Sequence, residues 1–110
     1  MTPVEQYIEA VKNKDFQKLG ELFTPDGHYC DYCANGTQQN EYHLYGQEAI
    51  TMFFRNKFLF CQYSILEPVI LNHYQAEFIA QFGNYCVMAI VSLQQITSDG
   101  HIRRLTVRPK

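Results

Sequence analysis

The sequence contains no tryptophan, no run of like charges and no long apolar segment. Without about 20 consecutive apolar residues, the chain offers no candidate for a membrane-spanning helix. The formal net charge of −2 argues against nucleic acid as a partner, because a phosphate backbone requires a concentrated basic face. The N-terminus is amphipathic and acidic, and it lacks the cationic start of a signal peptide. We therefore expect a cytoplasmic protein whose four cysteines stay reduced, with no membrane partner.

Charged residues are also scarce, at 18%, whereas the hydrophobic fraction of 46% is ordinary. The 110 residues are enough for one domain, spanning 1–110, with a single core. Aromatic residues are abundant instead, with eight tyrosines and eight phenylalanines. Because so many rings provide more apolar surface than a small core requires, we expect a ligand pocket, a subunit interface or both. The sequence has no glycine-rich phosphate-binding loop, and no cofactor is predicted.

Capping residues and apolar periodicity predict three helices in the N-terminal half of the chain. Thr2 is a helix cap, Pro3 suits the first helical position, and Glu5 completes a capping box. Asp15 is placed to cap a second helix, and Gly46 precedes a third. Between the last two, the sequence TPDG at 24–27 is typical of a turn, followed by a short strand that ends at Asn35-Gly36.

Beyond the third helix the apolar pattern changes to a period of two, which predicts strands. The four predicted strands are 62–71, 74–82, 85–96 and 101–107. The strand at 85–96 is apolar at almost every position, so we expect it near the centre of the sheet. Helices followed by strands indicate an α+β protein with helices packed on one face of a sheet.

The stretch HYCDYCANG, at 28–36, contains the densest group of chemically active side chains. If it is a strand, alternation places Tyr29, Asp31 and Cys33 on one face and Cys30 on the other. The two cysteines could then neither form a disulfide nor share a metal ion, and we predict no metal site. Two alternatives remain for Asp31. It is either a carboxylate in an apolar cavity, where desolvation would favour acid or base catalysis, or a solvent-facing residue that caps a loop.

The order of these elements resembles the nuclear transport factor two-like superfamily, which includes ketosteroid isomerases, SnoaL-like polyketide cyclases and scytalone dehydratases. The resemblance is carried by DFQKLGELFTPDG at 15–27 and YGQEAI at 45–50, and it covers nearly the whole chain. It implies a cone-shaped, curved mixed β-sheet closed by three N-terminal helices, also described as a cystatin-like α+β roll. It also implies a homodimer formed through the outer sheet face, consistent with YCVMAIVSL being apolar on both faces.

The resemblance to ketosteroid isomerases assigns roles to individual residues. Tyr7 matches the tyrosine that donates to the developing oxyanion, and Asp31 matches the aspartate base. Two positions differ, because Ser92 stands where the isomerases have a protonated aspartic acid and Phe54 where they have a supporting tyrosine. Steroid isomerisation in its known form is therefore not expected.

The other members suggest different chemistry. Dehydratases of the superfamily pair a histidine with the aspartate, and His43 and His73 are the candidates here. His28 alternates away from Asp31 and is discounted. A polyketide cyclase would need only an acidic residue beside an enolisable substrate, which Asp31 could provide.

The sequence thus predicts a mostly apolar cavity for a small hydrophobic molecule. Its predicted lining is Tyr7, Val11, Phe23, Tyr29, Asp31, Phe53, Phe54, Met88 and Ser92. Two functions remain open. One is proton transfer on a small carbonyl compound, with Asp31 as base and Tyr7 as oxyanion donor. The other is a non-catalytic binding or dimerisation module with the same cavity.

Overall fold

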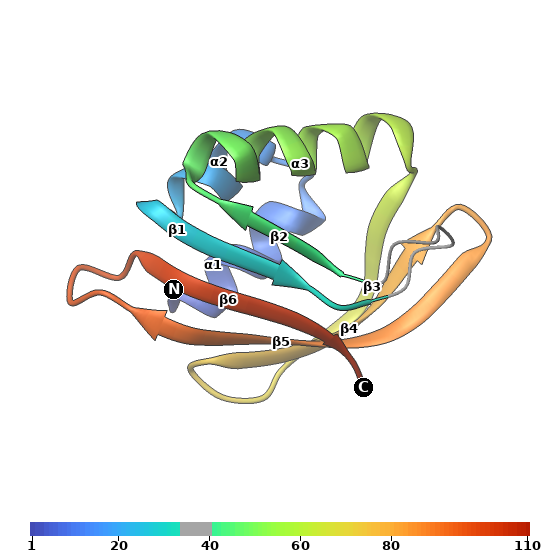
Figure 1. Cartoon of the computed structure of the whole chain (residues 1–110). Coiled ribbons are helices and arrows are strands. Elements are labelled where there is room, and N and C mark those ends of the chain that lie inside the picture. Colours follow the sequence, from blue (N-terminus) through green and yellow to red (C-terminus); the bar gives the residue numbers. More distant parts are fainter. Residues whose placement is uncertain (34–40) are drawn as a thin grey trace.

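The computed structural model describes residues 1–33 and 41–110 and shows three helices packed on a six-stranded sheet (Figure 1). The helices are α1 (Pro3–Lys12), α2 (Phe16–Glu21) and α3 (Gln47–Phe60). The strands are β1 (Phe23–Asp31), β2 (Tyr42–Tyr45), β3 (Tyr63–Ile70), β4 (Gln75–Phe82), β5 (Tyr85–Ile96) and β6 (Ile102–Pro109). The predicted Asn35-Gly36 turn lies outside the described residues.

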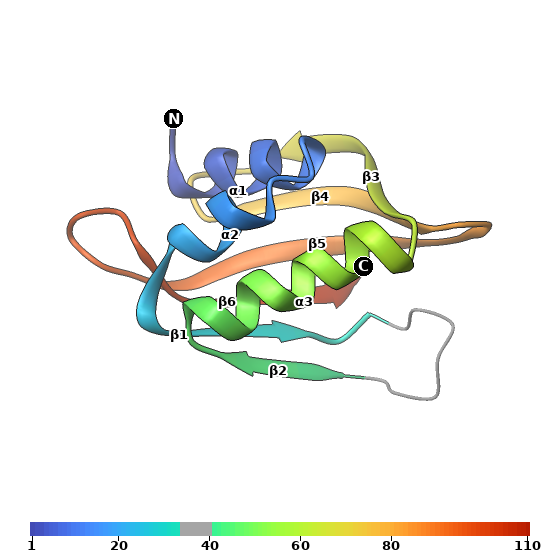
Figure 2. The same ribbon diagram turned by 90° about the horizontal axis from the view of Figure 1, so that it is seen from above.

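The sheet is mixed and has the order β2-β1-β6-β5-β4-β3. Strands β1 and β6 run parallel, whereas every other neighbouring pair is antiparallel. The sheet curves around the helices, which all lie on its inner face (Figure 2). This arrangement confirms the predicted cone-shaped α+β fold, and β5 lies near the centre of the sheet as expected.

The helices begin where the capping residues predict. Thr2 and Glu5 form a reciprocal capping box at the start of α1, and the Asp15 side chain accepts a hydrogen bond from the backbone of Lys18 in α2. Gly46 precedes α3 with a φ of 96°, a backbone conformation that favours glycine. Helix α1 buries one stripe, formed by Val4, Tyr7, Ile8, Ala10 and Val11. Among the described residues, no helix is long and apolar enough to cross a membrane.

The predicted turn at 24–27 is wrong, because these residues form the first part of β1. Strand β1 pairs with β6 on both sides of them, through Phe23 with Ile102 and His28 with Arg104. The register shifts between these two pairs, so the turn-forming residues produce a local irregularity in the strand rather than a chain reversal. The irregularity sets the register of the residues that follow, including Asp31.

Candidate functional site

A buried carboxylate lies at the end of β1, on the inner face of the sheet. Only 3% of Asp31 is exposed. Its Oδ2 atom accepts hydrogen bonds from the Tyr29 hydroxyl at 2.9 Å and from the Lys57 ammonium at 3.1 Å. Its Oδ1 atom accepts one from the backbone N–H of Cys33 at 2.9 Å. Asp31 therefore faces the interior, surrounded by three donors.

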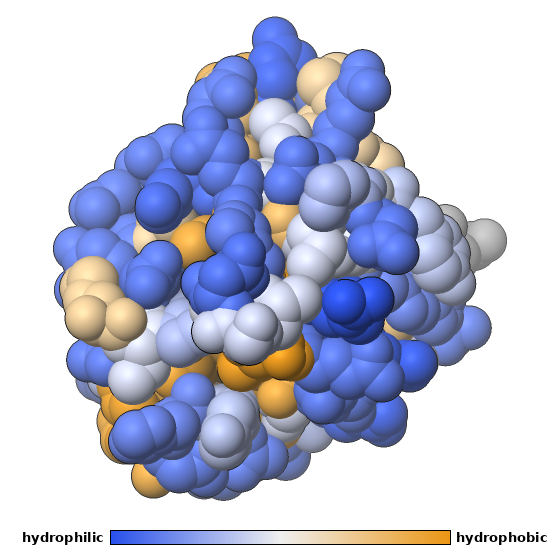
Figure 3. Space-filling model, turned by 90° about the vertical axis from the view of Figure 1, so that its left-hand side faces the viewer, coloured by the Kyte–Doolittle hydropathy of each residue, from blue (hydrophilic) through white to orange (hydrophobic). Residues whose placement is uncertain are grey.

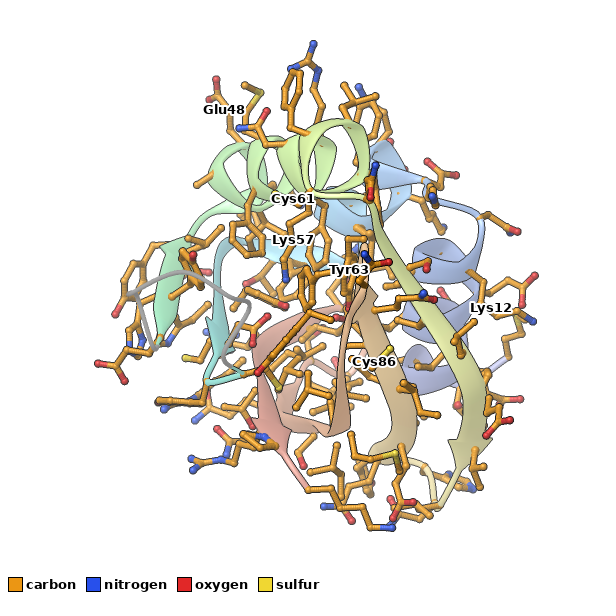
Figure 4. The ribbon with its side chains drawn as sticks, turned by 90° about the vertical axis from the view of Figure 1, so that its right-hand side faces the viewer. Lys12, Glu48, Lys57, Cys61, Tyr63 and Cys86 are labelled. Atoms are coloured by element: carbon orange, nitrogen blue, oxygen red, sulfur yellow. The ribbon has the colours of Figure 1, made fainter. Side chains whose placement is uncertain are left out.

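Lys57 is the residue of this site that the sequence analysis missed. It lies in the last turns of α3 with 4% of its surface exposed, and its side chain extends between helix and sheet near Tyr63 (Figure 4). The ammonium lies 4.8, 4.4 and 4.9 Å from the ring centres of Phe53, Tyr63 and Phe82. The ring faces and the Asp31 carboxylate together stabilise this buried cation.

Tyr7 points from α1 into the same interior. It is fully buried, and its hydroxyl has no hydrogen-bond partner among the described residues. Burial is the main cause that raises its pKa, and the charge of Asp31 acts in the same sense, whereas the nearby Tyr29 hydroxyl opposes both. An unpartnered buried hydroxyl is uncommon and calls for an explanation.

Burial also raises the pKa of the groups around this hydroxyl. The pKa values of Tyr29 and Tyr63 lie well above the ordinary phenol value, first because of burial and then because of neighbouring charges that include Asp31. Burial and the Asp31 carboxylate raise the pKa of the Cys33 thiol to about 12. These groups are therefore protonated at neutral pH and can act as hydrogen-bond donors.

Most of the predicted lining residues lie in the interior. Five of them are buried in the core, namely Tyr7, Val11, Phe23, Tyr29 and Phe54, and Phe53 packs against it. The prediction is wrong for Met88 and Ser92, which lie on the outer face of β5. Met88 is 45% exposed, and Ser92 accepts a hydrogen bond from the Gln75 side chain on β4. The residues of β5 that face inward are Ala89, Val91 and Leu93.

Four open pockets of the described surface lie away from Asp31 and Tyr7. One of about 730 Å³ lies between the start of α1, the turn after β3 and the end of β5, and its lining includes Ser92 and His73. Figure 3 faces the end of the molecule near the N-terminus and the β5–β6 turn, where the surface is mainly hydrophilic with smaller apolar areas. His73, one of the two histidines considered for a dehydratase, lies in an exposed turn. The polar partners of Asp31 named above include no histidine.

A second group of polar side chains lies on the opposite face of β1. His28 and Cys30 point outward there, next to His43 of the neighbouring strand β2. The Cys30 sulfur contacts His28, whereas Cys33 lies beside Asp31, so the two cysteines face opposite sides of the sheet. Burial and the nearby Arg104 lower the pKa of His28. Spacing along the sequence does not group these histidines with Cys30, because His43 comes from another strand.

Comparison with known proteins identifies the fold. No family model and no curated protein sequence matches the chain. Among solved structures, a protein from Sphaerobacter thermophilus superposes with a TM-score of 0.73 at 16% identity, covering 98% of this chain and 93% of that one. SalBIII, an epoxide hydrolase/cyclase-like enzyme of pyran ring formation in salinomycin, gives 0.72 at 17% identity, with 98% and 88% covered.

A hypothetical protein from Catenulispora acidiphila, described as having a ketosteroid isomerase-like fold, gives a TM-score of 0.65 at 17% identity, covering 96% of this chain and 82% of that one. The chain therefore shares the ketosteroid isomerase-like fold of this neighbour, which is the fold that the resemblance in the sequence implied. Because these identities are below 25%, the likeness establishes the fold and leaves the activity to be argued from the residues.

Proposed function

We propose that the interior around Asp31 binds a small hydrophobic carbonyl compound and transfers a proton on it, as in an isomerase, cyclase or dehydratase. The observation that carries this proposal is that the Tyr7 hydroxyl, which has no hydrogen-bond partner among the described residues, is buried in the same interior as the Asp31 carboxylate. A ligand carbonyl oxygen would satisfy that hydroxyl, and a C–H group next to the carbonyl would then lie toward the carboxylate. The names of SalBIII and of the isomerase-like neighbour are compatible with such chemistry.

The carboxylate has room for one more proton. A carboxylate offers about four lone-pair sites, and the three donors that the described residues place around Asp31 leave one of these sites on Oδ1. In the proposed reaction the substrate C–H bond breaks, its proton goes to Asp31, and its electron pair forms an enolate. The Tyr7 hydroxyl donates to the enolate oxygen. Asp31 then returns the proton to another substrate atom, which completes an isomerisation.

Lys57 distinguishes this site from that of the ketosteroid isomerases. Its ammonium and the Tyr29 hydroxyl both hold Oδ2 of Asp31, and they keep the carboxylate oriented with Oδ1 toward a ligand. Neither Ser92 nor Phe54 supplies the further donor found in the isomerases, since Ser92 faces outward and Phe54 has no hydroxyl. The site thus matches general proton transfer on a ketone better than steroid isomerisation.

Replacing Tyr7 with phenylalanine should separate catalysis from stability. The assay follows by NMR how fast the protein exchanges the α-hydrogens of 2-tetralone for deuterium in D2O. We expect Tyr7→Phe to catalyse this exchange about 100- to 1000-fold more slowly than the wild type, because one oxyanion donor is lost. The free energy of unfolding should stay the same or rise, because within 1–33 and 41–110 the hydroxyl removed has no hydrogen-bond partner.

The matched control is Tyr85→Phe, which removes an exposed hydroxyl and should change neither quantity. Exchange by Tyr7→Phe at the wild-type rate would contradict the role of Tyr7 as oxyanion donor. If the wild-type chain itself does not accelerate exchange over buffer, proton transfer on small ketones is refuted, and the second function is favoured.

The second candidate is a non-catalytic binding or dimerisation module. It is favoured by an apolar row across the outer sheet face, where Leu66, Ile79 and Met88 are neighbours in the register of β3, β4 and β5. Leu66 and Met88 are both more than 40% exposed. An exposed apolar row of this kind is typical of a protein–protein interface.

Light scattering at micromolar concentration is accordingly expected to give the mass of a homodimer. The double substitution of Leu66 and Met88 by glutamate should shift the protein to monomer, because two charges would be buried at the interface. Met52→Glu is the control, since Met52 is similarly exposed but lies on α3. A wild-type chain that is monomeric under these conditions would contradict this interface.

A further inference from the structure

Three potential metal ligands gather on the outer face of β1 and β2. His28 and Cys30 are two residues apart on β1, so their side chains share one face. His43 lies directly opposite Cys30 in the antiparallel register of β2. One ligand atom from each residue lies within 4.8 Å of the other two.

The individual distances fit a small metal ion. His28 Nε2 lies 3.2 Å from His43 Nδ1 and 3.0 Å from Cys30 Sγ. In a tetrahedral zinc site, two nitrogen ligands are about 3.3 Å apart, and a nitrogen and a sulfur about 3.6 Å, given the usual bond lengths. The third pair, at up to 4.8 Å, can close by rotation of the partly exposed His43 side chain.

The geometry points to a zinc site formed by His28 Nε2, Cys30 Sγ and His43 Nδ1, with the fourth position left to water. Two imidazoles and a thiolate are a ligand set that zinc favours. Such a site would join the edge strand β2 to β1, and it lies on the opposite sheet face from Asp31, so it is independent of the proposed proton transfer.

Neighbouring side chains hold two of the ligands in orientation. The His28 ring stacks on Tyr45 at 4.2 Å between ring centres. Glu41 Oε2 lies 3.7 Å from His43 Nε2, the nitrogen that points away from the cluster. A carboxylate beside the outer nitrogen is the usual support of a metal-binding histidine, since it leaves the other nitrogen free to bind the metal.

The charges around the cluster are of both signs. Arg104 of β6 pairs with His28 in the register and brings a positive charge, which opposes that of the metal ion. Glu41 brings a negative charge close to His43, and a metal-bound Cys30 would add a second one. The Nε atom of Arg104 is buried and has no hydrogen-bond partner among the described residues. Burial raises the pKa of the Cys30 thiol and the charge of Arg104 lowers it, and a thiolate formed on metal binding would lie next to this arginine.

Titration of the full, untagged and reduced chain with Co²⁺ tests the site, because tetrahedral Co²⁺ bound to a thiolate has an intense charge-transfer absorption. We expect one Co²⁺ per chain, displaced stoichiometrically by Zn²⁺. His43→Ala and Cys30→Ser should each weaken binding by more than about 100-fold, since loss of a ligand costs more than loss of a supporting residue. Zinc should also slow hydrogen exchange of the β2 amides in the wild type and not in His43→Ala.

The controls are His101→Ala and Cys61→Ser, which remove an exposed histidine and an exposed cysteine away from the cluster. Both should bind Co²⁺ like the wild type. The proposal is overturned if the wild-type chain shows no thiolate-to-cobalt absorption, if His43→Ala keeps wild-type affinity, or if either control loses the metal. His43→Ala alters a partly exposed side chain, so it keeps the test valid should Cys30→Ser fail to fold.

Discussion

Replacing Asp31 with asparagine is expected to lower the free energy of unfolding by about 3–5 kcal/mol, although the two side chains have nearly the same shape. The reason is Lys57, which the substitution leaves as a buried cation without its carboxylate partner. Three aromatic rings around the ammonium offset only part of this cost. Urea unfolding of both proteins, followed by circular dichroism, measures the difference.

The double variant Asp31→Asn, Lys57→Met is the matched control. It removes both charges, and we expect it to recover much of the stability lost in Asp31→Asn, because an ion pair can often be replaced by apolar groups at little cost. A double variant less stable than Asp31→Asn would contradict the account of Lys57 as an uncompensated charge. The same comparison matters for kinetics, because loss of activity in Asp31→Asn counts as loss of the base only where the protein is still folded.

Alkaline pH is expected to unfold the protein steeply. Tyr7, Tyr29 and Tyr63 have pKa values raised by burial, so in the folded state they keep their protons at a pH where unfolded tyrosines, with a pKa of about 10, have lost theirs. The unfolded state therefore binds fewer protons above about pH 10. Stability is fully present below that pH and falls by up to about 4 kcal/mol per pH unit above it, from three groups at about 1.4 kcal/mol each.

Phenolate absorbance measured together with circular dichroism tests this expectation. Of the eight tyrosines, these three should ionise only as the structure unfolds. In Tyr7→Phe the slope of stability against pH above 10 should fall by about one third, since one of three protons is removed from the balance. Complete ionisation of all tyrosines before unfolding would contradict the burial of the hydroxyl groups.

Much of the fold could be predicted from the sequence because local signals and tertiary packing agree in it. The capping box of Thr2 and Glu5 and the cap at Asp15 mark helices that the structure confirms. The strand predicted at 85–96 is β5 with the same bounds. At residues 24–27 the local signal and the tertiary structure disagree, because parallel pairing of β1 with β6 overrides the local preference for a turn.

The site was harder to predict, because it depends on which face a side chain occupies. Strand β5 is apolar on both faces, so its sequence has no alternation to show that Met88 points outward and Val91 inward. Lys57 was overlooked because lysine is rarely buried. Its position in the sequence nonetheless indicates burial, since Lys57 follows Ile50 and Phe54 at the spacing of the buried stripe of α3.

The cluster of His28, Cys30 and His43 depends on register, which spacing along the chain does not reveal. His43 meets Cys30 only because β2 returns antiparallel to β1. Alternation along HYCDYC separates its two cysteines, as predicted, and the structure combines Cys30 with a histidine two residues earlier and another from the next strand.

Strand β1 presents consecutive residues to the two faces of the sheet, with His28 and the buried Cys30 on the outer face and Tyr29 and Asp31 on the inner face. Because side chains alternate strictly, losing a single amino acid between them would exchange the two sets. An imidazole or a thiol would then meet the Lys57 ammonium, and the acid would move to the outer face of the sheet. The proposed proton-transfer site and the proposed zinc site therefore depend on the same spacing of a few consecutive residues of β1, and an insertion or deletion there would disrupt both.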